Sequence, residues 1–309
     1  MSAADLRVDL GRGCALPNPV GVASGTFGYG FEFEQLVDIQ QLGAIYTKGT
    51  TPLPREGNPP PRVAETAGGM LNSIGLQNPG VEHVARDYAP RFAQWRVPVI
   101  VNVAAATVEE YVHCLRVLDS AGGIAGYELN ISCPNIAHGL DFGLDPVAAG
   151  RVVAAARAAT ERCLVVKLSP NVTDVGAVAR AVEDAGADAV SAVNTFVGMK
   201  VHLGIRGPVL PGRGTGGLSG PAIKPLALAA VARVRAAVRI PVVGVGGIAS
   251  VGDALEFFVA GADAVQIGTA NFADPGVAPR VAAELADAAE RLHLSRLTEL
   301  RWQPAPTPA

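Results

Sequence analysis

One cysteine stands among amide and hydroxyl side chains rather than inside an apolar run. Cys133 belongs to the stretch ELNISCPN, residues 128–135, which follows directly on a run typical of a buried strand. It is either a small core residue or a reactive thiol within reach of a substrate. A thiol with a free pKa of about 8.5 can act as a base if its neighbours favour the thiolate.

The other three cysteines have ordinary settings. Cys14, Cys114 and Cys163 are widely separated and are typical of buried or helix-face residues. The sequence has no CxxC pair and no dense cysteine framework, so it indicates neither a zinc site nor a disulfide scaffold. We therefore expect no metal site, and any special cysteine must act alone.

Two lysines interrupt apolar runs that otherwise predict buried strands. Lys48 ends the run AIYTKG, and Lys167 lies in LVVKLS. Lysine is rarely buried without a partner, so each should face a ligand, a carboxylate or the open end of the fold. The alternative is a structural ion pair, for which the sequence offers Glu128.

Amide side chains recur at or near the ends of predicted strands and in one long loop. The set is Asn72, Asn102, Asn130 and Asn194, with Thr195 beside the last. Buried amides are costly unless they are hydrogen-bonded, so several converging on one mouth indicate a flat ligand rich in donors and acceptors. Any one of them could instead cap a helix. Together they favour a heterocyclic substrate that carries amide groups.

Glycines end two consecutive predicted strands. GVGGI contains Gly246 and Gly247, and IGTANF contains Gly268 and Thr269. In barrel proteins the last two loops often present backbone N–H groups to a phosphate. A single loop of this kind could merely turn the chain, but two on consecutive strands predict a phosphate site.

A histidine and an aspartate follow Cys133 in a glycine-rich loop. His138 and Asp141 could be drawn as a base and the group that orients it. A lone His and Asp in such a loop are more often solvated, so we assign neither a catalytic role.

The elements that must position these residues are short strands separated mostly by Ala-rich helical stretches. Strands that alternate with helices predict right-handed βαβ units around a parallel sheet, and eight units match a closed (β/α)8 TIM barrel. A doubly wound open sheet is the alternative. The predicted strands are PVGVAS near 19, AIYTKG near 44, VPVIVNV near 97, GYELNIS near 126, LVVKLS near 164, ADAVSAVN near 187, IPVVGVGG near 240 and ADAVQIG near 262.

Glycine marks the helix-to-strand junctions. The run AGADAV occurs at 185–190 and again at 260–265, and QLGAIYTKG has the same order of elements. In the last of these, Gly43 suits a left-handed helix C-cap. The repeat supports the barrel and says nothing about the substrate.

Three excursions begin where strands end, the place where barrel enzymes build their active sites. Long Pro- and Gly-rich loops follow the second and sixth strands, and the shorter segment CPNIAHGLDFGLDP follows the fourth. We expect one barrel domain over residues 1–300, with long active-site loops at the C-terminal ends of the strands. Residues 301–309 form a Pro-rich C-terminal tail.

Composition narrows the class of partner. The formal net charge is −3, so the chain lacks the excess of positive charge that is typical of nucleic-acid-binding proteins, and we expect small-molecule partners. No run approaches the roughly 20 apolar residues that span a bilayer, and no signal peptide is recognisable. These features predict a cytoplasmic protein without a membrane partner.

Taken together, eight motifs resemble the catalytic subunit of class 1B dihydroorotate dehydrogenases over nearly the whole chain. The glycine motifs are common to many flavin barrels, whereas the asparagine loop and the cysteine loop in this order are specific. The motifs are ASGTFGYGFE, PREGNPPPRVAETAGGMLNSIGLQNPG, ELNISCPN, VKLSPNVTD, VNTF, GTGGLSGPAIKP, VGVGGI and IGTANFADP.

The resemblance implies an FMN-dependent oxidation of (S)-dihydroorotate to orotate, the redox step of de novo pyrimidine (UMP) biosynthesis. Electrons would pass to NAD through a partner subunit that carries an iron–sulfur cluster and FAD. The implied assembly is a heterotetramer built on a catalytic homodimer. Carried over by motif, Cys133 falls at the family's catalytic base, which favours the reactive-thiol interpretation.

The resemblance also implies the binding residues. FMN would be contacted by Ser24, Lys48, Gly49, Asn102, Asn130, Lys167, Val193, Gly220, Gly246, Gly247, Gly268 and Thr269. Orotate would be held by Lys48, Asn72, Ser73, Ile74, Gly75, Leu76, Asn130, Asn194 and Thr195. The segment NIAHGLDFGLDP is one residue shorter than the family's usual loop, which bears on how Cys133 is shielded.

Two other enzyme classes remain open. Another FMN barrel acting on dihydropyrimidines would share the cysteine loop. A phosphate-binding lyase or synthase without flavin could instead use Lys48 or Lys167 as a Schiff base. A non-catalytic barrel scaffold is the remaining alternative.

Overall fold

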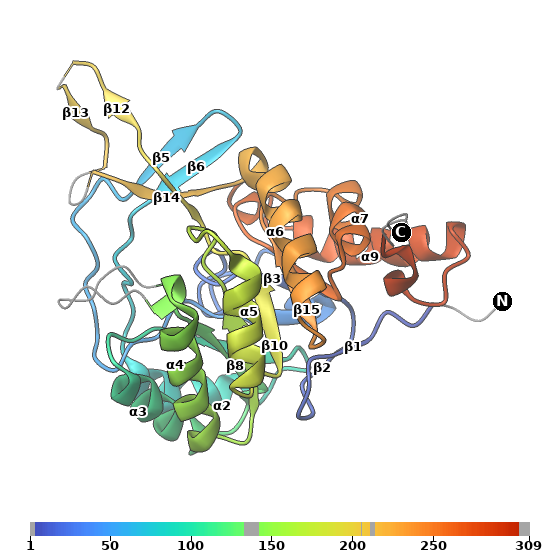
Figure 1. Ribbon diagram of the computed structural model, residues 1–309, viewed down its shortest axis with the longest axis horizontal. Helices are drawn as coiled ribbons and strands as arrows, with labels where there is room; N and C mark the ends of the chain where they lie inside the picture. Colours follow the sequence, from blue (N-terminus) through green and yellow to red (C-terminus); the bar gives the residue numbers. More distant parts are fainter. Residues whose placement is uncertain (1–3, 133–141, 205, 211–213, 303–309) are drawn as a thin grey trace, which may run out of the picture.

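The computed structural model describes residues 4–132, 142–204, 206–210 and 214–302, and all structural statements concern these. Eight parallel strands form a closed barrel, and consecutive strands along the chain pair until β16 meets β3 (Figure 1). This confirms the predicted barrel and rules out the open sheet. The strands are β3 (Val20–Val22), β4 (Ala44–Tyr46), β7 (Val99–Val103), β8 (Gly126–Asn130), β9 (Cys163–Lys167), β10 (Ala189–Ala192), β15 (Val242–Val245) and β16 (Ala264–Ile267).

The outer layer consists of helices that cover the barrel strands. Thr107, Asp145, Asp174 and Ser250 each cap a helix by accepting a hydrogen bond from a backbone N–H in its first turn. Valine and alanine side chains on the inner faces pack against the strands. The helices are α3 (Val108–Asp119), α4 (Pro146–Ala159), α5 (Val175–Asp184), α6 (Lys224–Ala237), α7 (Val251–Ala260) and α9 (Val277–Arg291).

Short helical elements complete the connections. They are η1 (Ile39–Gln41), α1 (Val81–His83), η2 (Val84–Tyr88), α2 (Ala89–Phe92), η3 (Phe142–Leu144), η4 (Pro221–Ile223), α8 (Ala270–Ala273) and η5 (Leu297–Leu300). In the part of the chain that the structure describes, no helix combines the length and the apolar character needed to cross a bilayer.

The glycine junctions behave as predicted at two of three places. Gly186 and Gly261 follow helices α5 and α7 with φ of +98° and +111°, the left-handed conformation that glycine tolerates. The prediction for Gly43 is wrong, because it follows the short η1, whose C-cap Leu42 is extended. Glycine is required there for another reason: a Cβ at Gly43 would overlap the carbonyl oxygen of Asn18.

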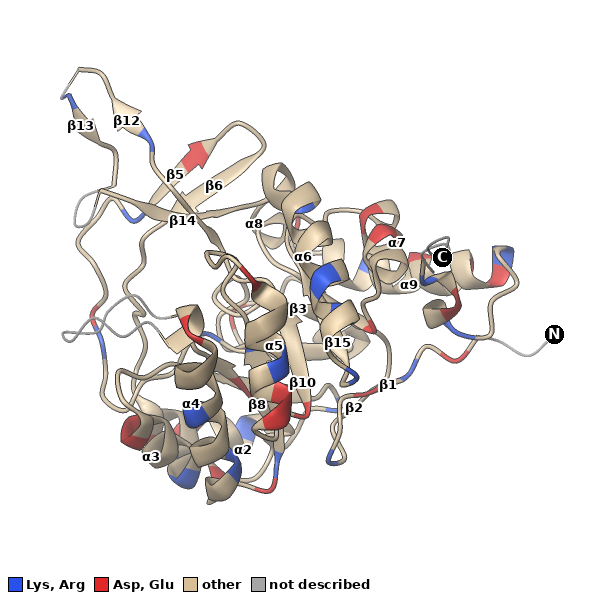
Figure 2. Cartoon of the chain, viewed as in Figure 1, with Lys and Arg blue, Asp and Glu red and all other residues tan. Residues whose placement is uncertain are grey.

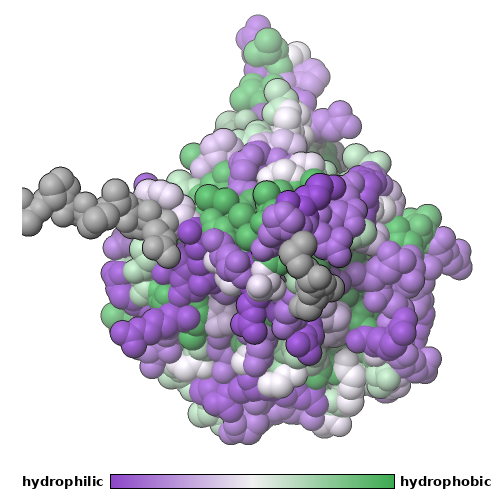
Figure 3. Space-filling view, turned by 90° about the vertical axis from the view of Figure 1, so that its right-hand side faces the viewer, coloured by the Kyte–Doolittle hydropathy of each residue, from purple (hydrophilic) through white to green (hydrophobic). Residues whose placement is uncertain are grey.

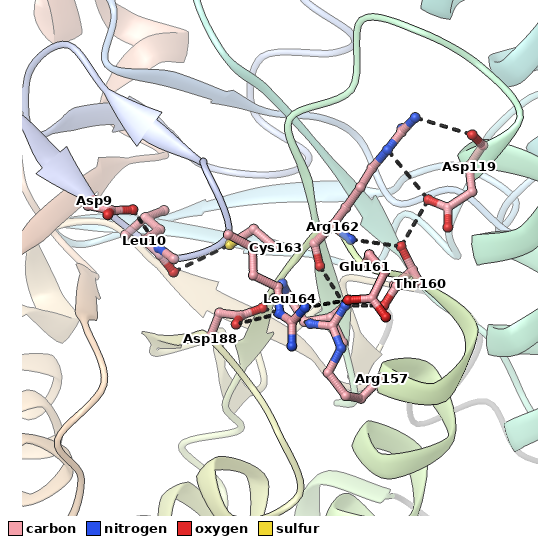
Figure 4. A network of polar contacts seen from close by, with 12 residues as sticks. Asp9, Leu10, Asp119, Arg157, Thr160, Glu161, Arg162, Cys163, Leu164 and Asp188 are labelled. Atoms are coloured by element: carbon pink, nitrogen blue, oxygen red, sulfur yellow. Dashed lines mark hydrogen bonds and ion pairs between the residues drawn. The ribbon is translucent and has the colours of Figure 1, made fainter.

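A small hairpin closes the N-terminal end of the barrel. Strands β1 (Val8–Asp9) and β2 (Ala15–Leu16) pair antiparallel, and the hairpin packs Leu10 and Cys14 against residues such as Tyr46 and Cys163. The thiol of Cys163 donates to the carbonyl of Leu10 over 3.4 Å (Figure 4). The hairpin thus plugs the floor of the barrel.

An ionic network beside this hairpin holds neighbouring strands together. Arg157 and the backbone N–H of Leu164 both donate to Asp188 Oδ2 at 2.8 Å (Figure 4). Arg12 from the hairpin donates to the other oxygen, Asp188 Oδ1, at 3.1 Å. The network is structural and lies at the end of the barrel away from the polar strand ends.

Beyond the C-terminal end of the barrel, the two long loops pair with each other. They form a four-stranded antiparallel sheet in the order β11, β14, β6, β5, from which the hairpin β12–β13 projects (Figure 1). The sequence predicted long loops here and not a sheet. The strands are β5 (Val63–Thr66), β6 (Gly69–Asn72), β11 (Phe196–Gly198), β12 (Val201–His202), β13 (Gly207–Pro208) and β14 (Gly216–Ser219).

The outer helices carry charged residues of both signs (Figure 2). Basic and acidic residues stand close together on α3, α4 and α5 (Figure 2). The side of the molecule that lies on the right in Figure 1 is mostly hydrophilic, with separate apolar patches (Figure 3). This mixed surface agrees with the small net charge of −3.

Candidate functional site

A cavity of about 600 Å³ opens at the C-terminal ends of the barrel strands, beneath the four-stranded sheet. This volume lies within the range of small-molecule sites, about 300–1,000 Å³. Every site residue that the sequence predicted and the structure describes lines it. These are Ser24, Lys48, Gly49, Asn72, Ser73, Ile74, Gly75, Leu76, Asn102, Asn130, Lys167, Val193, Asn194, Thr195, Gly220, Gly246, Gly247, Gly268 and Thr269.

Three residues that the sequence singled out lie outside the described residues. They are Cys133, His138 and Asp141. The chain reaches this segment from the cavity wall, because Asn130 at the end of β8 and Ser132 both line the cavity.

The floor of the cavity carries an ion pair. Lys167 Nζ lies 3.7 Å from Glu128 Oε2 and donates to Ser24 Oγ at 3.0 Å. Glu128 is fully buried, whereas Lys167 lies at the cavity surface and is 4% exposed. The two interpretations of Lys167, ligand contact and ion pair, are therefore compatible.

Asn102 on β7 presents an unused acceptor. Its Nδ2 donates to Glu128 Oε2 at 2.7 Å, while its Oδ1 is buried without a partner among the described residues. A Cβ at Gly49 would stand 3.1 Å from that oxygen. A buried, unsatisfied polar group costs about 1–3 kcal/mol. Because Asn102 lines the cavity, a bound ligand with an N–H group could satisfy it.

The amides on β8 and after β10 hold one another. Asn194 Nδ2 donates to Asn130 Oδ1 at 3.2 Å, and Asn194 Oδ1 accepts from the backbone N–H of Thr195 at 2.8 Å. In the four-stranded sheet, Asn72 Nδ2 donates to the carbonyl of Gly217 at 3.2 Å and so ties β6 to β14. These bonds fix the amide groups in place before any ligand arrives.

Lys48 brings a positive charge to the cavity, and its ammonium group donates no hydrogen bond to a described residue. Its backbone N–H donates to Gly28 at 2.8 Å, which fixes the strand end. Burial lowers the pKa of Lys48, with the positive charge of Arg62 acting in the same direction and Glu32 opposing both. A partly desolvated ammonium of this kind favours an anionic ligand.

The glycine turns after β15 and β16 leave room for backbone N–H groups. Gly246 and Gly247 have φ of +139° and +77°. A Cβ on Gly247 would lie 2.8 Å from Lys224 Cβ and 2.9 Å from the carbonyl oxygen of Gly220, so a side chain does not fit. The turn after β15 and Gly268 after β16 both line the cavity, as a phosphate cradle requires.

Several polar residues of the cavity were not predicted. Asn171 Nδ2 donates to the carbonyl of Thr195 at 3.1 Å, and its Oδ1 accepts from Val197 N–H at 3.0 Å, so it sets the path into β11. Ser132 Oγ is buried without a partner among the described residues. The sequence did contain a pattern that could have identified them. The runs SCPN after β8 and SPN after β9 are similar and follow neighbouring strands.

No group of three or more His, Cys, Asp or Glu side chains within the described ranges is arranged to hold a metal ion. The candidate site is thus a cavity with an amide-rich wall, two lysines and a pair of glycine turns. Such a set suits a phosphorylated, heterocyclic ligand and a small anion.

Comparison with known proteins agrees with this chemistry. Residues 9–288 match the family model described as dihydroorotate dehydrogenase. Three relatives bear the name dihydroorotate dehydrogenase B (NAD(+)), catalytic subunit. That of Listeria innocua is 49% identical over 94% of this chain and 95% of the relative. Those of Pelobacter propionicus and Geobacter sulfurreducens are 52% and 53% identical, covering 96% and 92% of this chain and 97% and 93% of the relatives. The chain belongs to the dihydroorotate dehydrogenase family.

Proposed function

We propose that this chain is the catalytic subunit of an NAD-linked dihydroorotate dehydrogenase. It oxidises (S)-dihydroorotate to orotate with FMN, in de novo pyrimidine (UMP) biosynthesis, and acts in the cytoplasm. Residues 1–300 serve as a single FMN-binding domain. The observation that carries the proposal is the convergence of glycine turns, Lys167 and the amide set on one cavity.

The residues present fit FMN. Its phosphate suits the glycine turns at Gly246, Gly247 and Gly268. At Gly246 a Cβ would lie 2.5 Å from Ala227 Cβ, and at Gly247 it would lie 2.8 Å from Lys224 Cβ, so neither position has room for a side chain. Its isoalloxazine ring offers both an N–H donor and several acceptors, which suits the unpaired Oδ1 of Asn102 and the ammonium of Lys167. When bound, the flavin supplies the acceptor for the hydride that leaves C6 of the substrate.

The remaining lining residues suit orotate and dihydroorotate. Lys48 would neutralise the carboxylate, since its ammonium is partly buried and has no described counter-ion within hydrogen-bonding distance. Asn72, Asn130, Asn194 and Thr195 would bind the ring N–H and C=O groups, and residues 73–76 would shape the wall. Because hydrogen bonds already hold these side-chain amides in place, they would orient the substrate at little entropic cost.

The proton at C5 requires a base on the face opposite the flavin. We assign this role to Cys133 on the strength of the ELNISCPN motif. Ser132, the residue before it, lines the cavity. The contribution of this chain's own residues is then a thiolate at Cys133 that takes the C5 proton.

The name "catalytic subunit" that the relatives carry supports the existence of a partner subunit. We propose a partner subunit with an iron–sulfur cluster and FAD that passes the electrons to NAD. The complete enzyme is a heterotetramer built on a homodimer of this chain.

Anaerobic reduction tests the proposal. The purified chain should be yellow, and dihydroorotate should bleach it while dihydrouracil leaves the absorbance unchanged. Faster bleaching by dihydrouracil would assign the chain to another pyrimidine-reducing barrel. A colourless protein that gains no colour with added FMN would favour a flavin-free lyase or synthase.

Orotate binding should weaken as the pH rises. The pKa of Lys48 is lowered by burial, so its ammonium loses its proton below the ordinary value of about 10.4. The dissociation constant of orotate should therefore increase with pH, beginning below that value. Titration of the flavin spectrum with orotate measures it.

The pH dependence of binding could also come from titration of orotate itself, and two variants of Lys48 distinguish these two causes. Lys48→Arg keeps its charge at every pH used and should remove the increase. Lys48→Met should bind orotate about ten- to a hundredfold more weakly at neutral pH, as expected for loss of about 1.4–2.7 kcal/mol. Identical pH profiles for the wild type and Lys48→Arg would contradict the assignment.

A further inference from the structure

Glu128 lies at the centre of the barrel and contacts four other strands. It is fully buried, and each carboxylate oxygen serves a different group of neighbours. Oε1 accepts from Ser191 Oγ at 2.8 Å and from Gln266 Nε2 at 3.0 Å. Oε2 accepts from Asn102 Nδ2 at 2.7 Å and lies 3.7 Å from Lys167 Nζ. One oxygen thus anchors the side chain to the barrel, and the other reaches two cavity residues.

We propose that Glu128 is a positioning residue that sets the electron affinity of the bound flavin through Lys167. The proposal rests on the proposed function, since it assumes that the cavity holds FMN. Glu128 itself does not line the cavity, so it acts through its neighbours.

The first consequence concerns Asn102. A carboxylate accepts hydrogen bonds and does not donate them, so Asn102 must turn its Nδ2 toward Glu128. Its Oδ1 is thereby directed away from Glu128 and is left without a described partner. Glu128 in this way decides that Asn102 offers the ligand an acceptor.

The second consequence concerns charge. Lys167 is held between Ser24 Oγ at 3.0 Å and the carboxylate at 3.7 Å. A cation at the cavity surface stabilises the negative charge that develops on a reduced flavin. The carboxylate behind it offsets part of that effect, because both charges lie in a medium of low dielectric constant. Glu128 should therefore make the flavin harder to reduce than Lys167 alone would.

The test is Glu128→Gln, which removes the charge and keeps the shape. The barrel can accept it, since Gln266 Oε1 has no described partner and could accept from the new amide after rotation. The flavin midpoint potential, measured with a reference dye and without dihydroorotate, should rise. We expect about a tenfold shift toward reduced flavin, or about 30 mV for a two-electron couple. The dissociation constant of FMN, from apoprotein fluorescence titration, should stay within about threefold, because the amide can still accept from Asn102.

The matched control is Ser191→Ala, which removes a contact to the other carboxylate oxygen. It lowers stability in the same buried cluster but should leave the potential unchanged. An equal shift in this variant would reduce Glu128 to a structural role and overturn the proposal. So would an unchanged potential in Glu128→Gln.

A second variant tests the route through Lys167. Lys167→Met, measured at saturating FMN, should lower the potential because the cation is lost. Adding Glu128→Gln to it should then have little effect, because the proposed route from Glu128 to the flavin through Lys167 no longer exists. An unchanged potential in Lys167→Met, or equal Glu128→Gln shifts in both backgrounds, would overturn the proposal. Failure of the proposed function is distinguishable, because the wild type would then bind no FMN or would not be bleached by dihydroorotate.

Discussion

Replacing Cys133 with alanine should leave the protein yellow and able to bind orotate, but unable to reduce its flavin at a normal rate. Loss of a general base typically costs about 10²–10⁴-fold in rate. Anaerobic stopped-flow measurement of flavin bleaching by dihydroorotate gives this rate. Cys133→Ser should also be slow and should improve toward high pH, because a hydroxyl is much harder to ionise than a thiol.

The other cysteines supply the control. Cys114 lies buried in α3, and burial raises its pKa to about 12. Contact with Cys14 and burial raise the pKa of Cys163 well above the ordinary range. These thiols should resist alkylation in the native protein, and Cys114→Ala should reduce its flavin normally. If Cys133→Ala also does so, Cys133 is not the base.

The barrel was predictable because its strands are buried on both faces. All five residues of β7 and all five of β9 are buried, and apart from Asn102 and Lys167 these strands appear in the sequence as apolar runs. Glycine junctions at Gly186 and Gly261 then separated helix from strand. The prediction failed at Gly43, where a close approach to Asn18 demands glycine and no helix cap is involved.

The sheet over the cavity could not be read from the sequence. Strand β14 has the sequence GGLS and no alternation of apolar and polar residues, and it pairs with Gly69–Asn72, far away along the chain. Its register depends on that distant partner. The hairpin β1–β2 escaped prediction for a similar reason, because each of its strands has only two residues.

The candidate site was predictable to the extent that the barrel rule applies. Parallel strands place their C-terminal ends on one rim, so Lys48, Asn130 and Lys167 had to lie near one another once the barrel was assumed. The sequence could not show that the two carboxylate oxygens of Glu128 contact different groups of neighbours, because these partners lie on four different strands. A sequence indicates that an acidic residue is available for an ion pair, but it does not show which carboxylate oxygen contacts which neighbour.

The chain on its own should reduce artificial dyes with dihydroorotate but should reduce NAD poorly. An iron–sulfur cluster needs several cysteine thiolates together. The four cysteines stand at positions 14, 114, 133 and 163, and Cys114 and Cys163 are buried in separate core clusters. One GxGxxG run occurs, from Gly212 to Gly217, but Gly216 and Gly217 belong to the antiparallel strand β14 and open no helix. A nicotinamide site of the usual strand-to-helix kind requires that helix.

Steady-state assays with dihydroorotate and either a dye or NAD measure the difference. Addition of an iron–sulfur flavoprotein partner that carries FAD should restore NAD reduction without changing the rate of flavin bleaching, because the partner acts after the chemical step on the substrate. The dye assay on the same sample is the internal control for active chain. The expected complex contains two copies of each subunit, which light scattering would report from its mass. Rapid NAD reduction by the pure chain, with no partner present, would show that electrons leave this protein by a route of its own.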